Sequence, residues 1–175
     1  MFRRRLLAIV GATVLAGCSG GDDTNPTPTP TVTPTPPPDP VFDGVGPGQL
    51  QFGAHYLPSD EAWGQEDDGE WVRCTNSEET VRVSGRTEVY DTVPNAIDAY
   101  DELVADLGKT DTLDAGSAAV VSPGTGIAIG ILRVRNAVSE IRAIWIEDGA
   151  AGSLSGYAAT AVRNQAEVWE QQAEE

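Results

Sequence analysis

The spacing of hydrophobic positions changes several times between residues 80 and 172, and each spacing predicts a different element. Over residues 80–90 apolar and polar residues alternate, which is the period of a strand with one buried face. The apolar side carries three valines and the polar side three charged residues, respectively Val81, Val83, Val89 and Arg82, Arg86, Glu88. We therefore predict a half-buried strand at the start of this region.

The next segment changes to a spacing of three and four residues, which is the period of an amphipathic helix. Thr92 suits the N-cap of this helix, Pro94 suits its first turn, and Gly108 suits its end. Its apolar stripe consists of Val93, Ile97, Tyr100, Val104 and Leu107, with acidic residues between them.

Three further strands are expected at residues 117–122, 127–135 and 138–146, separated by turns at residues 123–126 and at Asn136. Residues 127–132 are apolar at nearly every position, as expected of a central strand. An apolar stripe then predicts a closing helix over residues 153–172. Residues 41–79, rich in glycine and acids with scattered aromatics, predict short strands and loops.

These elements predict an α+β domain with a β-α-β-β-β-α core. We expect an antiparallel sheet of about four to six strands, with both helices packed on one face. The order over residues 80–172 resembles the small sensor-like or substrate-binding-like domains of secreted bacterial and archaeal lipoproteins. The features that carry this resemblance are Ala96, Ala99 and Tyr100 in the first helix, Arg133 to Asn136 at a strand end, and Gln165 and Trp169 in the last helix.

The N-terminal segment predicts export and a lipid anchor. Arg3, Arg4 and Arg5 precede an apolar run of twelve residues from Leu6 to Gly17, and Cys18 follows. A membrane-spanning helix needs about 20 apolar residues, so the run is too short to be the anchor. The segment resembles a lipoprotein signal with a lipobox, which implies that Cys18 is lipidated and residues 1–17 are removed. The alternative is an ordinary secretory peptide with Cys18 as a bystander.

The export route stays open. Two arginines, a further residue and the pair Leu6-Leu7 resemble the twin-arginine export pattern, but three consecutive arginines also fit a simpler secretory signal. The segment from Ser19 to Pro40 contains a threonine-proline alternation over residues 26–38, which predicts an extended stalk. The chain is thus expected to divide into a signal peptide (1–17), a lipidated cysteine with its stalk (18–40) and one globular α+β domain (41–175).

The charge of the chain indicates the kind of environment in which the protein works. Removal of residues 1–17 takes away three arginines and no acid, so the formal net charge falls from −16 to −19. Lys109 is the single lysine. Such an acidic, lysine-poor composition resembles proteins of extremely halophilic archaea, where molar salt shortens the Debye length to about 3 Å and screens the repulsion. An acidic protein from an ordinary organism is the alternative. Either way, we expect no nucleic-acid partner.

No cofactor or metal site is expected from the residue types. A blue-copper site needs two histidines and a cysteine, but after signal removal the chain has only His55 and Cys74, and no methionine. A zinc site would need more ligands than this pair. A calcium loop at residues 66–70 lacks the spacing of an EF-hand. We expect Cys74 to be a buried free thiol, apart from His55.

Arg133, Arg135 and Arg142 are the candidate binding residues, because they place three guanidinium groups on one predicted hairpin. Such groups pair bidentately with anions. They can equally neutralise nearby acids: a turn at Asn136 and Ala137 would bring Arg133 opposite Glu140. Ligand binding and structural pairing are both open at this point.

We conclude from the sequence that the protein is a lipid-anchored extracellular surface protein of a halophile. Its expected role is non-enzymatic binding of an envelope protein or a small solute, as a sensor-like domain does. Two alternatives stay open: an extracytoplasmic hydrolase that uses carboxylates, and a structural spacer of the cell envelope.

Overall fold

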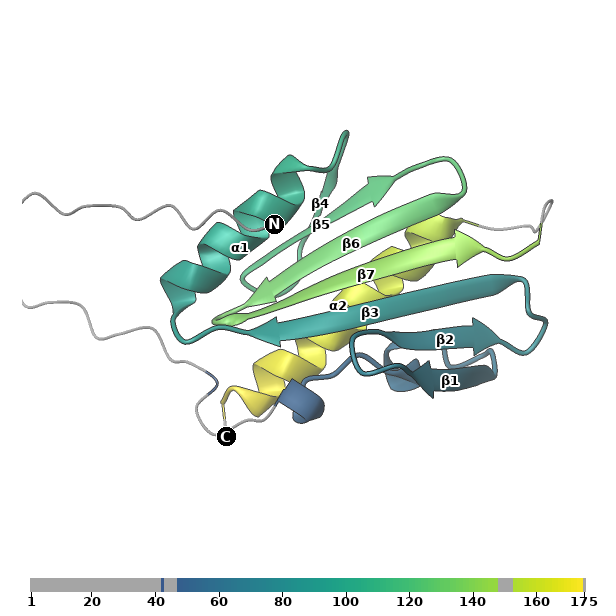
Figure 1. Cartoon of the computed structure of the whole chain (residues 1–175), viewed down its shortest axis with the longest axis horizontal. Helices are drawn as coiled ribbons and strands as arrows, with labels where there is room; N and C mark the ends of the chain where they lie inside the picture. Colours follow the sequence, from purple (N-terminus) through teal and green to yellow (C-terminus); the bar gives the residue numbers. More distant parts are fainter. Residues whose placement is uncertain (1–41, 43–46, 148–152, 175) are drawn as a thin grey trace, which may run out of the picture. The chain divides into compact units, whose positions relative to one another are not determined.

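The computed structural model describes Phe42, residues 47–147 and residues 153–174, all within a compact unit from Pro37 to Glu175. These residues form one seven-stranded antiparallel sheet in the order β1-β2-β3-β7-β6-β5-β4 (Figure 1). The strands are β1 (Trp63–Asp67), β2 (Val72–Asn76), β3 (Val81–Val89), β4 (Asp111–Leu113), β5 (Ala118–Pro123), β6 (Ile127–Val134) and β7 (Ala137–Trp145). The helices are η1 (Pro47–Gln49), η2 (Ala54–Tyr56), α1 (Val93–Ala105) and α2 (Leu154–Gln172).

The α+β class and the antiparallel sheet are confirmed, but the strand count exceeds the four to six that we predicted. The additional strands are short and lie at the two ends of the strand order, with β1 and β4 as the edge strands. β1 and β2 come from the glycine-rich and acidic segment, and β4 has only three residues. Strands of this length contain too few residues for a period of two to stand out in the sequence.

Both long helices begin where the sequence predicted, because each has a hydroxyl side chain at its N-cap. Thr92 Oγ1 accepts a hydrogen bond from Asn95 N at 3.3 Å, and Ser153 Oγ accepts one from Gly156 N at 3.2 Å. Each bond satisfies one amide that has no partner within the helix. Pro94 lies in the first turn of α1, where its missing N–H costs nothing.

The prediction that both helices pack on one face of the sheet is wrong: they pack on opposite faces (Figure 1). Ile131 and Leu132 are neighbours on β6 and so point in opposite directions. Leu132 belongs to the cluster that contains α2, whereas Ile131 belongs to the cluster that contains Tyr100 of α1. The physical reason is that β6 is apolar on both faces, and each face has to be covered.

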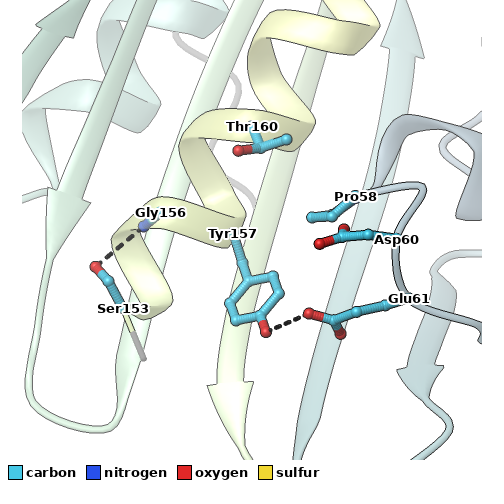
Figure 2. Close-up of a pocket in the computed structure, with 7 residues that line it drawn as sticks. All are labelled: Pro58, Asp60, Glu61, Ser153, Gly156, Tyr157 and Thr160. Carbon is cyan, nitrogen blue, oxygen red and sulfur yellow. Dashed lines mark hydrogen bonds between the residues drawn. The ribbon is translucent and has the colours of Figure 1, made fainter. Parts of the chain in front are cut away.

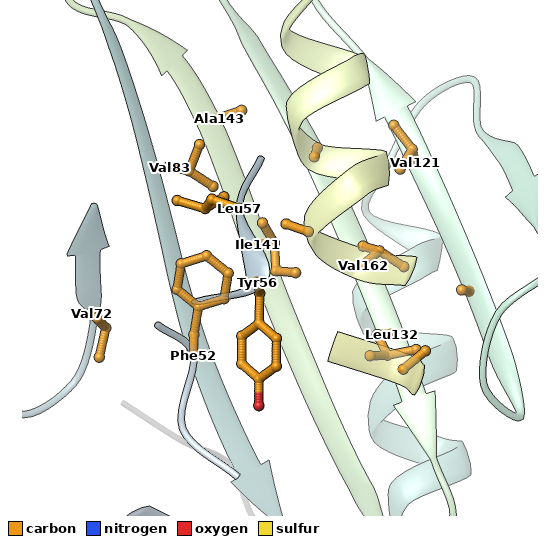
Figure 3. Close-up of a cluster of buried hydrophobic side chains, with 14 of the residues drawn as sticks. Phe52, Tyr56, Leu57, Val72, Val83, Val121, Leu132, Ile141, Ala143 and Val162 are labelled. Atoms are coloured by element: carbon orange, nitrogen blue, oxygen red, sulfur yellow. The ribbon is translucent and has the colours of Figure 1, made fainter. Parts of the chain in front are cut away.

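The face covered by α2 holds the main core. The helix packs over β5, β6 and β7, and the segment with Phe52, Tyr56 and Leu57 extends this layer over β2 and β3 (Figure 3). Gly130 allows α2 to approach, because a Cβ atom there would lie 2.7 Å from Val162 Cγ2. Gly85 similarly makes room for the ring of Phe52. Two strand glycines thus set the thickness of this layer.

On the opposite face α1 contacts β6 and β7, and its cluster includes Val120 of β5. No described helix covers this face over β1, β2 and β3, and the adjacent part of β7 carries the half-buried and exposed side chains Ile144 and Arg142. We call this uncovered part the open face. Within residues 47–147 and 153–174, no helix is both long enough and apolar enough to cross a membrane.

Candidate functional site

The strand register gathers four arginines around one small residue on the open face. Ser84 of β3 pairs with Arg73 on β2 and with Arg142 on β7. Arg82 and Arg86 lie two residues before and after it on β3, and residues with this spacing share a face. We call Arg73, Arg82, Arg86 and Arg142, with Ser84 at their centre, the arginine cluster.

A buried glutamate fixes two of these arginines. Glu140 Oε2 accepts hydrogen bonds from Arg86 Nε at 3.0 Å and from its Nη2 at 2.8 Å. Glu140 Oε1 is bound in the same way by Arg142, with 2.7 Å to Nε and 2.5 Å to Nη2. The side chain of Glu140 is only 6% exposed. A buried carboxylate is costly unless hydrogen bonds and ion pairs replace its contacts with water. Glu140 therefore holds both guanidinium groups in place.

The indole of Trp71 supports the same two arginines. The guanidinium carbon of Arg142 lies 4.5 Å from the centre of the Trp71 ring, and that of Arg86 lies 5.1 Å away. These distances are typical of cation–π contacts. The turn before β2 holds Trp71, because Asp68 Oδ1 accepts hydrogen bonds from the backbone N of Trp71 at 2.7 Å and of Glu70 at 3.1 Å. The bond from Trp71, followed by that from Glu70, lowers the pKa of Asp68.

The cluster has more positive than negative charge within contact distance. Arg73 pairs with Asp68 at 2.5 Å, and Arg86 reaches Glu70 at 3.5 Å in addition to Glu140. The side chain of Arg82 makes no hydrogen bond or ion pair with the described residues. Four guanidinium groups therefore face three carboxylates, on a chain that is strongly acidic overall.

An apolar strip borders the cluster. Ile144 pairs with Arg82 on one side and with Ile127 on the other, and Ile129 pairs with Arg142. Ile127 is 36% exposed, and Ile129 and Ile144 are half-buried. The open face thus offers fixed positive charge beside apolar surface, a combination that suits binding and that no single strand shows in the sequence.

The structure separates the three arginines that the sequence singled out. The hairpin turn consists of Arg135 and Asn136, with Val134 paired to Ala137, so Arg133 pairs with Val138. The conditional pairing of Arg133 with Glu140 is therefore wrong, because the turn lies one residue earlier than we assumed. The partner of Arg133 therefore moves by two residues along the second strand, so Glu140 stays on the same face as Arg133 but does not lie opposite it.

Only Arg142 belongs to the arginine cluster. Arg133 Nη1 donates to the backbone O of Arg135 at 3.2 Å. Arg135 has a positive φ of 53° and donates from Nη1 to the backbone O of Ala173 at 2.6 Å. It lines a cavity of about 360 Å³ with Glu170 and Glu174. Arg133 and Arg135 thus each donate to a backbone carbonyl at the end of the hairpin, and anion binding by either stays a prediction.

A second cavity lies where the loop after η2 meets the start of α2 (Figure 2). Its volume is about 310 Å³, and Tyr157 donates a hydrogen bond to Glu61 Oε1 at 2.8 Å within it. Glu61 Oε2 is buried without a partner among the described residues. Burial away from water, and to a lesser extent the hydrogen bond to Glu61, raise the pKa of Tyr157 to about 12. Asp60, Ser153 and Thr160 complete the polar lining.

The remaining candidates are placed as follows. Cys74 is a buried free thiol, as expected, and burial raises its pKa to about 11. His55 is exposed, and its ring lies beside that of Tyr56 at an interplanar angle of 47°, with 3.9 Å between ring centres. Cys18 lies outside the described residues, so its lipidation stays a prediction. Residues 47–147 and 153–174 contain no group of three or more acidic, histidine or cysteine side chains that could hold a metal ion.

Comparison with known proteins gives no match: no protein-family profile, no curated protein and no solved structure matches this chain. The arginine cluster is the site that sequence reasoning missed. The sequence contains part of the signal for this cluster, because its alternation puts Arg82 and Arg86 on the polar side of one strand. Arg73 and Arg142 lie on other strands, and only the register brings them to Ser84.

Proposed function

We propose that this protein is a lipid-anchored, extracellular binding domain of a halophile that docks a protein partner on the open face of its sheet. One observation carries the proposal: the arginine cluster lies on a sheet face that no described helix covers, with two of its guanidinium groups held by Glu140 and Trp71. Side chains fixed before binding lose little freedom when a partner arrives, which favours affinity.

The anchor is supported by the order of residues at the N-terminus. Three arginines, a short apolar run and Cys18 fit export followed by lipidation, and the threonine-proline segment after Cys18 fits a stalk. A tethered domain meets its partners at a membrane surface, where the effective concentration of both is high. A docking surface of modest affinity is then sufficient.

The cavity at Tyr157 favours a second candidate function, the binding of a small solute. Its volume of about 310 Å³ lies at the lower end of small-molecule sites. Glu61 Oε2 has no hydrogen-bond partner among the described residues, so a solute with a donor group would satisfy it after a small rearrangement. Loss of a solute-dependent stabilisation in Glu61→Gln would support this candidate.

Attachment is tested by membrane fractionation of Cys18→Ser in a halophilic host. We expect the mature protein to leave the membrane fraction, or an uncleaved precursor to accumulate. Protein of mature size that stayed with the membrane would refute lipid anchoring at Cys18.

Docking is tested by photo-crosslinking from a thiol placed at Ser84. The full-length protein is purified, Ser84→Cys is labelled with a thiol-specific photo-crosslinker and the product is returned to cell membranes. Cys74 should not react, because it is buried and its pKa is raised. The matched control is Arg163→Cys, which places the label on an exposed position of α2.

We expect a discrete crosslinked species from Ser84→Cys that is absent from Arg163→Cys and is lost when excess unlabelled wild-type protein competes. Equal labelling from the two positions would show that the open face is not the docking surface.

A further inference from the structure

We propose that the arginine cluster receives carboxylate side chains from an acidic segment of the partner protein. This inference rests on the proposed docking function and adds the chemistry of the partner. It follows from the arrangement of charges around Ser84, from the unpaired guanidinium of Arg82 and from the apolar strip beside them.

The centre of the cluster is occupied by a small side chain. Ser84 is half-buried and is surrounded by Arg82 and Arg86 on its own strand and by Arg73 and Arg142 across the sheet. Directly opposed residues have Cβ atoms about 5 Å apart, and diagonal neighbours lie about 7–8 Å apart. An incoming carboxylate above Ser84 would therefore be within reach of more than one guanidinium group.

Two guanidinium groups keep binding capacity after the internal pairs are made. Arg82 has no ion pair with the described residues. Arg142 uses Nε and Nη2 for Glu140, and its side chain is 44% exposed. Arg86 and Arg142 each bind one oxygen of Glu140 through Nε and Nη2, so the fold already contains the charge-assisted pairing that a second carboxylate would make.

The overall negative charge of the chain does not prevent this contact in concentrated salt. The formal net charge, −16 for the whole chain and −19 after removal of the three arginines in residues 1–17, would repel an acidic partner at long range. At molar salt the Debye length is about 3 Å, so long-range repulsion is screened, whereas pairs in direct contact are weakened much less. Binding then depends on local pairs, and the open face is where the described arginines gather.

The apolar strip favours a polypeptide over a free anion. Ile127, Ile129 and Ile144 follow the cluster along the neighbouring strands, and Trp71 borders it on the other side. A free phosphate or carboxylate has no apolar part to cover these side chains. A polypeptide that carries acidic and apolar side chains on one side covers both features, because side chains two residues apart in an extended chain point in the same direction.

The test uses the full-length protein in detergent at a fixed molar salt concentration. The probes are two fluorescein-labelled peptides of sixteen residues, one that repeats glutamate-serine-valine-serine and one that repeats glutamine-serine-valine-serine. We expect the glutamate peptide to bind at least about tenfold more tightly, because a charge-assisted pair is stronger than a neutral one. Arg82→Ala should weaken its binding by about tenfold, whereas the matched control Arg163→Ala should not change it.

A second variant probes the cluster without any partner. Ser84→Glu places a carboxylate at the centre of the four arginines, whereas Ser84→Gln adds the same volume without charge. On so acidic a chain an added carboxylate normally repels, but here Ser84→Glu should have a higher unfolding temperature than Ser84→Gln. It should also abolish binding of the glutamate peptide. A lower unfolding temperature for Ser84→Glu would overturn the inference.

The remaining outcomes separate the inference from the proposed function. Equal binding of both peptides, or equal effects of Arg82→Ala and Arg163→Ala, overturns the acidic partner but leaves docking intact if Ser84→Cys still crosslinks specifically. Binding of inorganic phosphate or of anionic phospholipid vesicles that depends on Arg82, without binding of the glutamate peptide, assigns the cluster to another anion. Absence of specific crosslinks overturns the docking function itself.

Discussion

The two faces of β3 follow different rules although their residues alternate along one strand. Gly85 points toward α2 and Phe52, where a Cβ atom would lie 2.3 Å from the Phe52 ring carbon Cγ. Its neighbours Ser84 and Arg86 point to the open face, where Arg86 forms ion pairs with Glu140 and Glu70. Packing volume limits which residues fit on the first face, and charge pairing limits which residues fit on the second. Substitutions on β3 and its neighbours should therefore act through packing on one face and through electrostatics on the other.

Salt removal should have the largest effect, because it acts on the acidic surface of the whole domain. The chain has 27 acidic and 11 basic residues, so most carboxylates have no basic partner. We expect a folded domain in molar KCl that loses its near-UV circular dichroism and its cooperative thermal transition as the salt falls toward 0.1 M, where the Debye length is about 10 Å. An unchanged transition down to 50 mM would contradict the halophilic interpretation.

Gly85→Val should lower the free energy of unfolding by about 3 kcal/mol, because the added methyl groups collide with Phe52 in a filled core. Gly64→Val is the matched control, since Gly64 lies in β1 and a Cβ atom there would approach nothing closer than 3.8 Å. Its effect should stay within about 0.5 kcal/mol. Denaturant unfolding at constant molar salt measures both. Similar losses for the two variants would contradict the difference between the faces.

Glu140→Gln should lower the free energy of unfolding by about 2–3 kcal/mol. Breaking a fully buried pair costs about 3–5 kcal/mol, but Arg86 and Arg142 are 34% and 44% exposed, so water recovers part of the loss. Glu167→Gln, on the exposed side of α2, is the control and should be nearly neutral. Fluorescence of Trp71 in the folded state should also change, because its two guanidinium neighbours lose their anchor.

The smallest effect concerns alkaline pH and Tyr157. Its pKa in the folded state is about 12, above the ordinary value of 10.0, so the folded state keeps the phenol proton longer than the unfolded state. The stabilising contribution is present below pH 10 and is lost between pH 10 and 12. Tyr157→Phe should therefore show a shallower fall of the unfolding temperature between pH 9 and 11, by on the order of 1–3 °C.

The alkaline fall should not vanish in Tyr157→Phe, because burial raises the pKa of Tyr56, Tyr90 and Tyr100 in the same direction. A slope identical to that of the wild-type protein would show that the pKa of Tyr157 is not raised in the folded state. Thermal unfolding followed by far-UV circular dichroism over this pH range is the measurement.

The sequence predicted the long elements correctly where their hydrophobic positions follow one clear period. β3, α1, β5, β6, β7 and α2 all lie within two residues of their predicted ends, apart from the early end of α1 at Ala105. Prediction failed for β4, whose three residues carry no period, and it left β1 and β2 as unspecified short strands. Of the arginine cluster, only Arg142 was among the binding residues expected from the sequence, because the turn at Arg135 and Asn136 decides which side chains meet.

The amino-acid sequence by itself determined the order of the main elements, the burial of Cys74 and the acidic character of the chain, because each depends on local spacing or on composition. The tertiary structure decided which face each helix covers and which arginines gather around Ser84. Both depend on strand register, and a shift of one residue exchanges the two faces of a strand. The residues of the cluster come from three strands and from positions 73–142, so no local pattern could place them together.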